Sequence, residues 1–439
     1  SKIASSAHTP EIGTLIDNAM RAIEAENKSL KNVLPKNYAS PDLDKRVLGD
    51  VVDLFTNMDM SDTKENKDLL GKTYQYCIQQ FAAYEGVKGG EFYTPESIVK
   101  TIVAILKPYE NCRVYDPCCG SGGMFVQSAD FIEAHRGNRG KISVYGQESN
   151  ADTWKMAKMN MAIRGIDANF GPYQADTFFN DLHPTLKADF IMANPPFNQK
   201  QWRAENELVD DPRWNGYEVP PTSNANYGWI LNIVSKLSRN GVAGFLLANG
   251  ALSDDGTELK IRQQLIENHL VEAIIILPRN LFYTTDISVT LWIINKNKKA
   301  RVVMQNNKPK AYRDRTDEIL FMDLRQMGSP YEKKYIELTE EDRTKVAATY
   351  HAWQSQNATE EYKDIDEYCY SAKKEEVAAK GYSLVPSKYI KFVNRDENID
   401  YDTKMKQLQS ELTDLLKEEE KSKEDLLAVF KELGYEIKL

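Results

Sequence analysis

Between residues 11 and 83, apolar residues recur every three or four positions, the pattern of helices that bury one face. Ile12 and Ile16 belong to one such stripe. Pro35 and Pro41 interrupt the pattern, because proline breaks a helix interior. The chain is therefore expected to begin with a helical region made of several short helices.

From about residue 97 to residue 300, short apolar runs typical of strands alternate with helical patterns. This alternation predicts an α/β fold with a doubly wound, mostly parallel sheet. The last two strand patterns, 271–278 and 287–296, have no helix between them, so we expect an antiparallel hairpin at one edge of the sheet. The other strand patterns cover 112–116, 142–148, 188–193 and 241–248, and the helical patterns cover 96–106, 124–135, 150–165, 227–239 and 258–270.

Near the C-terminus, apolar residues alternate at steps of three and four, which is the seam of a coiled coil. Glu419 and Ser422 interrupt this seam. A single helix cannot bury such a seam, so the helix either folds back on its own domain or docks on a partner helix, and we favour the partner. The apolar seam residues are Met405, Leu408, Leu412, Leu415, Leu426, Val429 and Leu433.

These patterns divide the chain into four parts. Residues 1–85 form the N-terminal helical region, and residues 86–300 form the domain built on the sheet. Residues 301–395 are interpreted as an extension of that domain, in which 301–380 carry no chemistry that the sequence identifies. Residues 396–439 form the coiled-coil helix.

The composition is that of an ordinary soluble protein, with 41% hydrophobic and 28% charged residues. No apolar run approaches the roughly 20 residues of a membrane span, and no secretory signal pattern is present. The five cysteines show no paired spacing, which favours reduced thiols and a cytoplasmic protein. The chain begins with Ser1 instead of methionine, so we expect it to be part of a longer product.

The net charge of −9, from 56 basic and 65 acidic residues, argues against a protein that binds a long duplex alone. If nucleic acid is the substrate, the basic groups are local or a partner makes most of the phosphate contacts.

A glycine-rich turn, "DPCCGSGG" at 116–123, lies between a strand and a helix, where doubly wound sheets bind ligands. It lacks the final spaced glycine of a dinucleotide site and the lysine of a phosphate loop. An acid, a proline and small residues fit a cationic ligand better than a pyrophosphate. Cys118 and Cys119 have no further clustered ligands, so we interpret them as small loop residues and expect no metal.

Two further acids follow strand patterns. Glu148 ends the second strand and is placed to accept both hydroxyls of a ribose. Asp176 is interpreted as the end of a third strand, where it could accept a hydrogen bond from an adenine amino group. A role as a loop-capping residue is almost equally compatible with its spacing.

The stretch "GGEFYTPESIVK" at 89–100 precedes these motifs. Thr94 is expected to cap the following helix, with Pro95 in its first turn. Beyond a well-capped helix, the sequence suggests a loop whose Phe92, Tyr93 and Thr94 close over the ligand.

The tetrapeptide "NPPF" at 194–197 directly follows an apolar strand. Its two prolines fix the backbone and remove two amide donors, so the Asn194 side chain and the Pro195 carbonyl present acceptors in fixed directions. Two adjacent acceptors fit an exocyclic amine with two hydrogens, and Phe197 offers a flat face for stacking. Holding both N–H groups frees the lone pair of the amine for attack by position and electrostatics alone.

Residues 198–226 form a long link with little periodicity that carries Trp202, Trp214 and Tyr217. Such links are often binding loops or lids. Packing of these aromatic residues and a substrate-contacting loop are equally compatible with the sequence.

The ordered set "FYTP", "DPCCGSGG", "GQE", "AD" and "NPPF" resembles the gamma class of adenine-specific DNA methyltransferases that use S-adenosylmethionine. The stretches at 241–250, 281–294 and 381–390, with the coiled-coil tail, look like the modification subunit of type I restriction-modification systems. The resemblance covers nearly the whole chain and implies a Rossmann-like methyltransferase sheet. Family members carry more helical sequence before the start of this chain, so we expect the helical domain to be incomplete.

The resemblance implies a role for each motif. Phe92, Tyr93 and Thr94 would contact the methionine part of S-adenosylmethionine, and Glu148 and Asp176 its ribose and adenine. Asn194 would touch both the cofactor and a target adenine flipped out of the duplex. The cofactor cradle would be Asp116, Gly120, Ser121, Gly122 and Gly123, and the adenine site Asn194, Pro195, Pro196 and Phe197.

The resemblance also implies partners. Two modification subunits would act with one specificity subunit that reads double-stranded DNA, and a restriction subunit could join them in a bacterial or archaeal cell. The C-terminal helix would dock on the specificity subunit. Two alternatives stay open: a methyltransferase acting on RNA or protein glutamine, and a non-catalytic assembly subunit that binds cofactor only to order itself.

Overall fold

The computed structural model describes residues 2–57, 64–85, 93–282, 286–305, 308–331, 335–359, 361–393 and 401–432. It consists of two compact units, Ser1–Ile390 and Lys391–Leu439, which are described separately below. The finer division made from the sequence, into a helical region, a sheet domain and an extension, stays a prediction.

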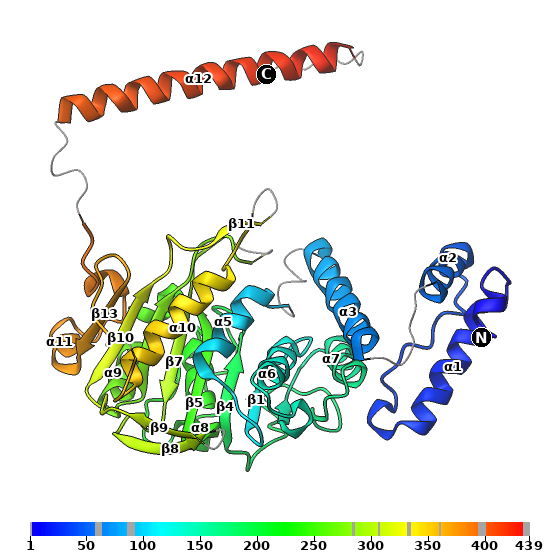
Figure 1. Cartoon of the computed structure of the whole chain (residues 1–439), viewed down its shortest axis with the longest axis horizontal. Coiled ribbons are helices and arrows are strands. Elements are labelled where there is room, and N and C mark those ends of the chain that lie inside the picture. The colour runs from blue at the N-terminus through cyan, green and yellow to red at the C-terminus, as the bar shows by residue number, and fades with distance from the viewer. Residues whose placement is uncertain are drawn as a thin grey trace. The chain divides into compact units, whose positions relative to one another are not determined.

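A nine-stranded sheet forms the centre of the first unit, in the order β13-β10-β6-β7-β5-β4-β1-β2-β3 (Figure 1). Among these described strands, β7 and β13 run antiparallel to the others. The mostly parallel α/β sheet is therefore confirmed. The strands are β1 Arg113–Asp116, β2 Ser143–Gly146, β3 Ala168–Asn169, β4 Ala188–Ala193, β5 Leu237–Ala248, β6 Val271–Ile276, β7 Val289–Asn295, β10 Glu318–Asp323 and β13 Cys369–Lys373.

The expected hairpin is present as β6 and β7, but its expected place at the sheet edge is wrong. β7 inserts between β5 and β6, and β10 pairs in parallel with β6 on the far side. β13 then forms that edge. β10 and β13 both come from the extension to which the sequence assigned no role, so this part of the chain completes the sheet.

Helices cover both faces of the sheet and form two separate apolar cores. Successive strand residues point to opposite faces, so that Val114 joins one core and Tyr115 the other. One core takes in α5 Glu96–Leu106, α6 Gly123–Ala134, α7 Ala151–Ile163 and α10 Glu340–Gln354. The other takes in α8 Asn226–Lys236, α9 Thr257–Glu267 and α11 Lys374–Ala379. Residues 237–239, expected at the end of a helix, instead begin β5.

The N-terminal residues are helical, as expected. α1 Ile12–Glu26 and α2 Lys45–Thr56 share a small core of Ile12, Ile16 and Leu48. α3 Lys64–Glu85 lies against α7, where the Tyr74 hydroxyl donates to the Met156 carbonyl and Arg164 donates to the Gly71 carbonyl. Short 3-10 turns lie at Ala4–Ser6, Lys28–Leu30, Arg139–Lys141, Pro212–Trp214, Asn249–Leu252 and Pro386–Lys388.

Two small hairpins project from the extension: β8 Arg301–Gln305 with β9 Lys308–Tyr312, and β11 Ser329–Tyr331 with β12 Tyr335–Glu337. Beneath the first hairpin, Glu272 of β6 is fully buried and accepts hydrogen bonds from Arg315 and Gln354, at 2.9 and 3.1 Å. These three side chains, Glu272 of β6, Arg315 and Gln354 of α10, therefore link the sheet to α10.

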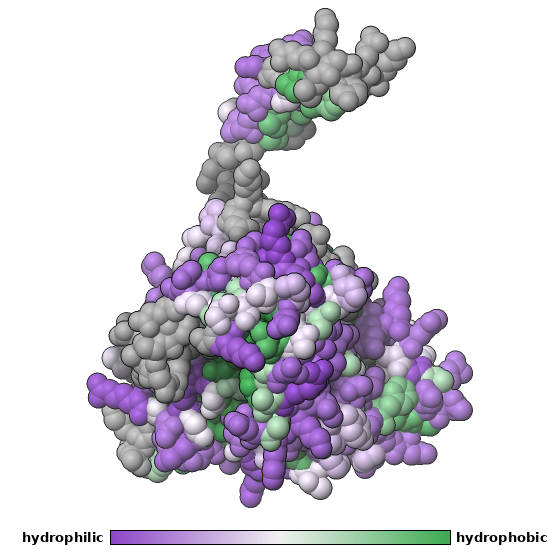
Figure 2. Space-filling model, turned by 90° about the vertical axis from the view of Figure 1, so that its right-hand side faces the viewer, coloured by the Kyte–Doolittle hydropathy of each residue, from purple (hydrophilic) through white to green (hydrophobic). Residues whose placement is uncertain are grey.

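The second unit contains α12, Tyr401–Glu432. The apolar seam residues on this helix that the structure describes are exposed, from 39% for Met405 to 62% for Leu415. Figure 2 shows apolar side chains among hydrophilic ones along its described part. Leu433, the last expected seam residue, lies outside the described residues. Among the described helices, none combines the length and apolar character of a membrane span.

Candidate active site

The glycine-rich turn at the end of β1 forms the floor of the site. Asp116 is buried, and its Oδ1 accepts the Cys118 amide proton over 2.9 Å. Gly122 has a left-handed backbone with φ of 81°, and α6 begins at the next residue. A Cβ at Gly122 would also lie 3.0 Å from the Met161 side chain. The left-handed backbone therefore favours glycine at this turn, whereas the flexible end of the Met161 side chain can move aside for a Cβ.

Glu148, two residues beyond the end of β2, holds this turn in place. One carboxylate oxygen accepts the Gly120 amide proton over 3.1 Å, and the other accepts the Asn150 amide proton over 2.8 Å. The acid after the second strand and the turn after the first are thus one hydrogen-bonded unit.

Both acids are held in surroundings that disfavour their charge. Burial raises the pKa of Asp116 to about 7, and the nearby Glu148 adds to this rise. Burial also raises the pKa of Glu148 above its ordinary value. No positive charge from the described residues is among the causes of these two shifts, so a cationic ligand bound here would lower both pKa values.

Asn194 faces this turn from the end of β4. Its Nδ2 donates to the Thr94 hydroxyl over 3.1 Å, which leaves Oδ1 as the free end of the amide. Oδ1 is buried and has no hydrogen-bond partner among the described residues. A buried acceptor without a donor costs free energy, which makes it a mark of an unfilled binding position.

Thr94 does not have the expected role as a helix cap. α5 begins at Glu96, its N-cap is Pro95, and no side chain caps the end. The Thr94 hydroxyl accepts from Asn194 instead. The prediction was wrong because a sequence shows the local capping pattern and not a partner 100 residues away.

A small cavity joins these groups, with a volume of about 20 Å³. It has room for about one water molecule, so only a small group would fit inside it and the rest of a larger ligand would extend outward. Thr94 and Asn194 line it together with Asp116, Cys118, Cys119, Gly120, Ser121, Gly123 and Met124.

The remaining residues of the tetrapeptide lie beside the cavity. Pro195 is buried, Pro196 is exposed and Phe197 is half-buried. The Phe197 ring meets Phe282 edge to face, with centroids 6.0 Å apart. This contact fixes the aromatic side chain next to the Asn194 acceptor.

Comparison with known proteins identifies the chain. The model of the N-6 DNA Methylase family matches residues 65–398. The chain belongs to this family. It is 41% identical, over 97% of its own length and 93% of the other chain, to the methylase subunit of the type I restriction enzyme HindI from Haemophilus influenzae.

Solved structures agree with this assignment. The methyltransferase subunit of a type I restriction-modification system from Streptococcus thermophilus superposes with a TM-score of 0.75 at 25% identity, covering 89% of this chain and 79% of that one. A protein from Listeria monocytogenes, described as a class I S-adenosylmethionine-dependent methyltransferase, shares the fold, with a TM-score of 0.51, 14% identity, and coverage of 79% and 99%. A DNA N6-adenine methyltransferase of the type I modification-subunit kind, inferred from the motifs, is thus confirmed.

The FYTP motif supplies two further residues that were expected to bind the cofactor, Phe92 and Tyr93, and only Tyr93 lies among the described residues. Tyr93 is buried and packs with Ile78 of α3, so the motif also connects the helical region to the site. Phe92, Gly89 and Gly90 lie outside the described residues.

Asp176 lies seven residues beyond Asn169, the last residue of β3, and not at the end of a strand as expected. It is exposed, and its Oδ1 accepts the amide protons of Phe178 and Phe179 over 2.7 and 3.2 Å. These bonds match the loop-capping alternative. Its expected contact with the adenine of the cofactor stays a prediction.

Gln147 is a residue that sequence reasoning passed over, although it is the middle letter of "GQE". It is fully buried, and its amide donates to the carbonyls of Ala175 and Asn180 and accepts from the Leu182 amide. It therefore holds the Asp176 loop beside the end of β2. The sequence signal for Gln147 was a polar, uncharged residue inside a motif that follows a strand.

The link at 198–226 is anchored by buried indoles. Trp202 packs against Phe178 with ring centroids 4.4 Å apart, and it meets Trp214 edge to face at 6.2 Å. Both indole N–H groups donate to loop carbonyls. The packing interpretation therefore accounts for both tryptophans.

The described residues contain no group of three or more potential metal ligands. The site does suit S-adenosylmethionine, the cofactor implied by the fold. The glycine turn allows close approach of a ligand, and the two acids favour a cation such as a sulfonium or ammonium group.

Replacing Thr94 by valine should slow methyl transfer at saturating cofactor by about 10- to 100-fold, because the Asn194 amide loses the contact that orients it. Thr94→Ser keeps the hydroxyl and should retain most of the activity. Initial rates with labelled cofactor measure both. Full activity of Thr94→Val with an unchanged thermal midpoint would show that Asn194 is held by other means.

The pH dependence of stability tests the buried acid. The folded pKa of Asp116, about 7, lies above its unfolded value near 4. The protonated carboxyl therefore stabilises the fold fully below pH 4, and this contribution is lost as pH rises through 7. Asp116→Asn should stabilise the cofactor-free protein at pH 8, by up to roughly 4 kcal/mol. The gain should shrink toward pH 5.

Denaturant unfolding across this pH range measures the effect. Asp152→Asn, at an exposed position of α7, is the matched control and should leave the pH profile unchanged. Equal stability of Asp116→Asn and the unaltered protein at every pH would contradict a raised pKa.

Proposed function

We propose that this chain transfers the methyl group of S-adenosylmethionine to the N6 amine of an adenine flipped out of duplex DNA. It does so as the modification subunit of a type I restriction-modification complex and thereby protects host DNA. The observation that carries the proposal is Asn194 Oδ1, a buried acceptor without a donor beside the glycine turn. An adenine amine brings the donor that this acceptor lacks.

The residues of the chain act mainly by position. Asn194 Oδ1 accepts one proton of the amine and the Pro195 carbonyl accepts the other, which turns the nitrogen lone pair toward the cofactor. Phe197 stacks on the base and keeps it out of the duplex. When bound, S-adenosylmethionine supplies an electrophilic methyl group. Glu148 would hold the ribose hydroxyls of the cofactor, and Asp116 and the turn 120–123 would hold its charged end.

The chain works with a specificity subunit that reads the DNA sequence, in a ratio of two modification subunits to one. The net charge of −9 supports this division of labour, because a duplex is bound mainly through its phosphates. The exposed seam of α12 provides the docking surface for that partner. A restriction subunit can join the same assembly.

Asn194→Ala tests the chemistry. In the assembled complex it should lower methyl transfer by at least about 100-fold, since a positioned acceptor for developing charge is lost, while cofactor binding measured by calorimetry persists. The assay follows labelled methyl into DNA and identifies the base. Methyladenine formed at the normal rate by Asn194→Ala would refute the mechanism.

The same assay separates the alternatives. Activity with the specificity subunit and none without it supports delegated DNA reading. Label in RNA or in protein glutamine would indicate another substrate. No turnover with partner and DNA would indicate a non-catalytic assembly subunit.

Partner docking is tested on the C-terminal helix. Leu412→Glu combined with Leu415→Glu should weaken binding to the specificity subunit by at least about 100-fold, because two apolar contacts become buried charges. Ser410→Glu combined with Thr413→Glu adds the same charge at outer heptad positions and should bind normally. Analytical ultracentrifugation compares the two. Equal binding would remove α12 from the interface.

A further inference from the structure

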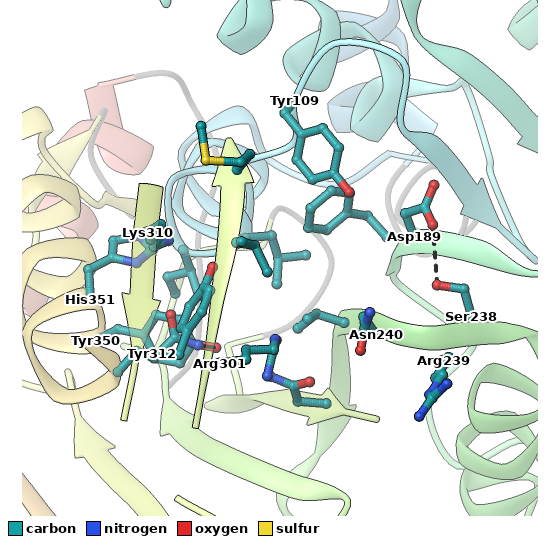
Figure 3. A pocket seen from close by; sticks show the side chains of 18 residues that line it. Tyr109, Asp189, Ser238, Arg239, Asn240, Arg301, Lys310, Tyr312, Tyr350 and His351 are labelled. Atoms are coloured by element: carbon teal, nitrogen blue, oxygen red, sulfur yellow. Dashed lines mark hydrogen bonds between the residues drawn. The ribbon is translucent and has the colours of Figure 1, made fainter. Parts of the chain in front are cut away.

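A second cavity lies at the opposite end of the central strands from the methylation site. Asp189 at the start of β4, Ser238 and Asn240 in the first half of β5, and Asn295 at the end of antiparallel β7 line it. The hairpin β8–β9 and helix α10 form the facing wall (Figure 3). Its volume is about 340 Å³, and it shares no residue with the cavity at the glycine turn. The two sites are therefore separated by the length of the strands.

Cationic side chains dominate the charge of this cavity. Arg239, Arg301 and Lys310 line it, against a single carboxylate, Asp189. That carboxylate is already paired, since both of its oxygens accept from the Arg113 guanidinium at 2.9 and 3.2 Å. Figure 3 shows Arg301 and Lys310 on the hairpin side and Asp189, bonded to Ser238, on the other. The field inside is therefore positive in a chain whose net charge is −9.

Two of these cations are gathered around one ring. Arg301 lies 4.7 Å and Lys310 4.8 Å from the centroid of Tyr312. Burial, together with the charges of Arg315 and Arg301 and against the opposing Glu272, lowers the pKa of Lys310 to about 8. The Arg301 Nε is buried without a hydrogen-bond partner among the described residues. An anion would accept a hydrogen bond from the Arg301 Nε and would stabilise the charged form of Lys310.

The neighbouring cavity continues the same charge. It has a volume of about 790 Å³ and shares Lys310 and His351 with the first. Lys107, Lys345 and Lys363 line it against one carboxylate, Glu361, and Lys345 lies 4.5 Å from the Tyr368 ring. The cationic surface thus extends outward from Lys310, which leaves space for a ligand with more than one anionic group.

Phosphate is the anion that this arrangement fits best. Guanidinium groups match the geometry of phosphate oxygens and ammonium groups bind them as point charges. The volume falls in the range of small-molecule sites, and the exposed side chain of Asn240 offers an amide to the rest of a ligand. We propose that this pocket binds a phosphate-bearing small molecule of about mononucleotide size. The site is independent of the methyl-transfer function.

Calorimetry on the full chain tests the proposal, with AMP as the probe and adenosine as its phosphate-free match. Saturating S-adenosylhomocysteine fills the cofactor site in every titration, so adenine binding there is excluded. Binding at the target-adenine position would not depend on Lys310, which lines only the second cavity and its neighbour. AMP should bind under these conditions, and adenosine at least about tenfold more weakly, because it lacks the charged group. Inorganic phosphate should compete with AMP.

Lys310→Gln should weaken AMP binding by at least about tenfold. Its thermal midpoint without ligand should stay level or rise, since the substitution removes a desolvated cation near other cations. A purely structural lysine would instead lower the midpoint. Lys417→Gln removes the same charge from an exposed position of α12 and should bind AMP normally. Methyl transfer by both variants should be unchanged.

Three results would overturn the proposal: equal affinity for AMP and adenosine, AMP binding that Lys310→Gln leaves intact, or no AMP binding at all. A short duplex that loses affinity in Lys310→Gln while AMP never binds would assign the pocket to a DNA-contacting surface. None of these outcomes bears on Asn194, so this pocket and the methylation site can fail separately.

Discussion

The hydrogen bond between the Asn194 amide and the Thr94 hydroxyl decides what the site can recognise. An amide side chain has a donor end and an acceptor end, and in this bond the donor end points at the Thr94 hydroxyl. The acceptor end is then left facing the glycine turn, buried and without a donor. Rotation of the amide by half a turn would present N–H groups to a substrate amine and repel it. The chemistry thus depends on one contact between segments 100 residues apart.

The surroundings of Asn194 explain how this contact keeps its geometry. β4 is almost wholly buried and pairs with β1 on one side and β5 on the other, so the backbone before Asn194 is fixed. Pro195 and Pro196 fix the backbone after it. Thr94 directly precedes the N-cap of α5, whose apolar face belongs to the same core as β4. The backbone is therefore held on both sides of Asn194, which keeps the buried Oδ1 acceptor in its place.

The acids are positioned by the parallel register of the sheet. Asp116 on β1 lies opposite Gly146 on β2, so the residues that follow the two strands meet at one edge. Glu148 consequently reaches the Gly120 amide, and both acids lie in a buried setting that opposes their ionisation. Burial of these two acids lowers the stability of the cofactor-free protein, and the same burial makes the site favour a cationic ligand.

The sequence predicted those parts of the site whose causes are local. A strand followed by glycines, or by an asparagine and two prolines, can be recognised within ten residues or so, and the roles of the β1 and β4 ends follow from that. The Thr94 partner, the Gln147 anchor and the place of β6–β7 inside the sheet depend on residues far along the chain. The placement of Asp176 at a strand end was wrong for a different reason, because β3 has only two residues and is too short to show a sequence pattern.

The two edges of the sheet differ in charge, and this reconciles an acidic chain with a phosphate-bearing ligand. The carboxyl edge holds Asp116 and Glu148, which repel phosphate and favour a cation. The amino edge gathers Arg301 and Lys310 around Tyr312, with the carboxylate of Asp189 already paired to Arg113. The net charge, which argues against a long duplex bound by this chain alone, therefore does not locate the site of a small anion. An anionic small molecule is directed away from the methylation site, and a cationic cofactor toward it, by the same separation of charge along the strands.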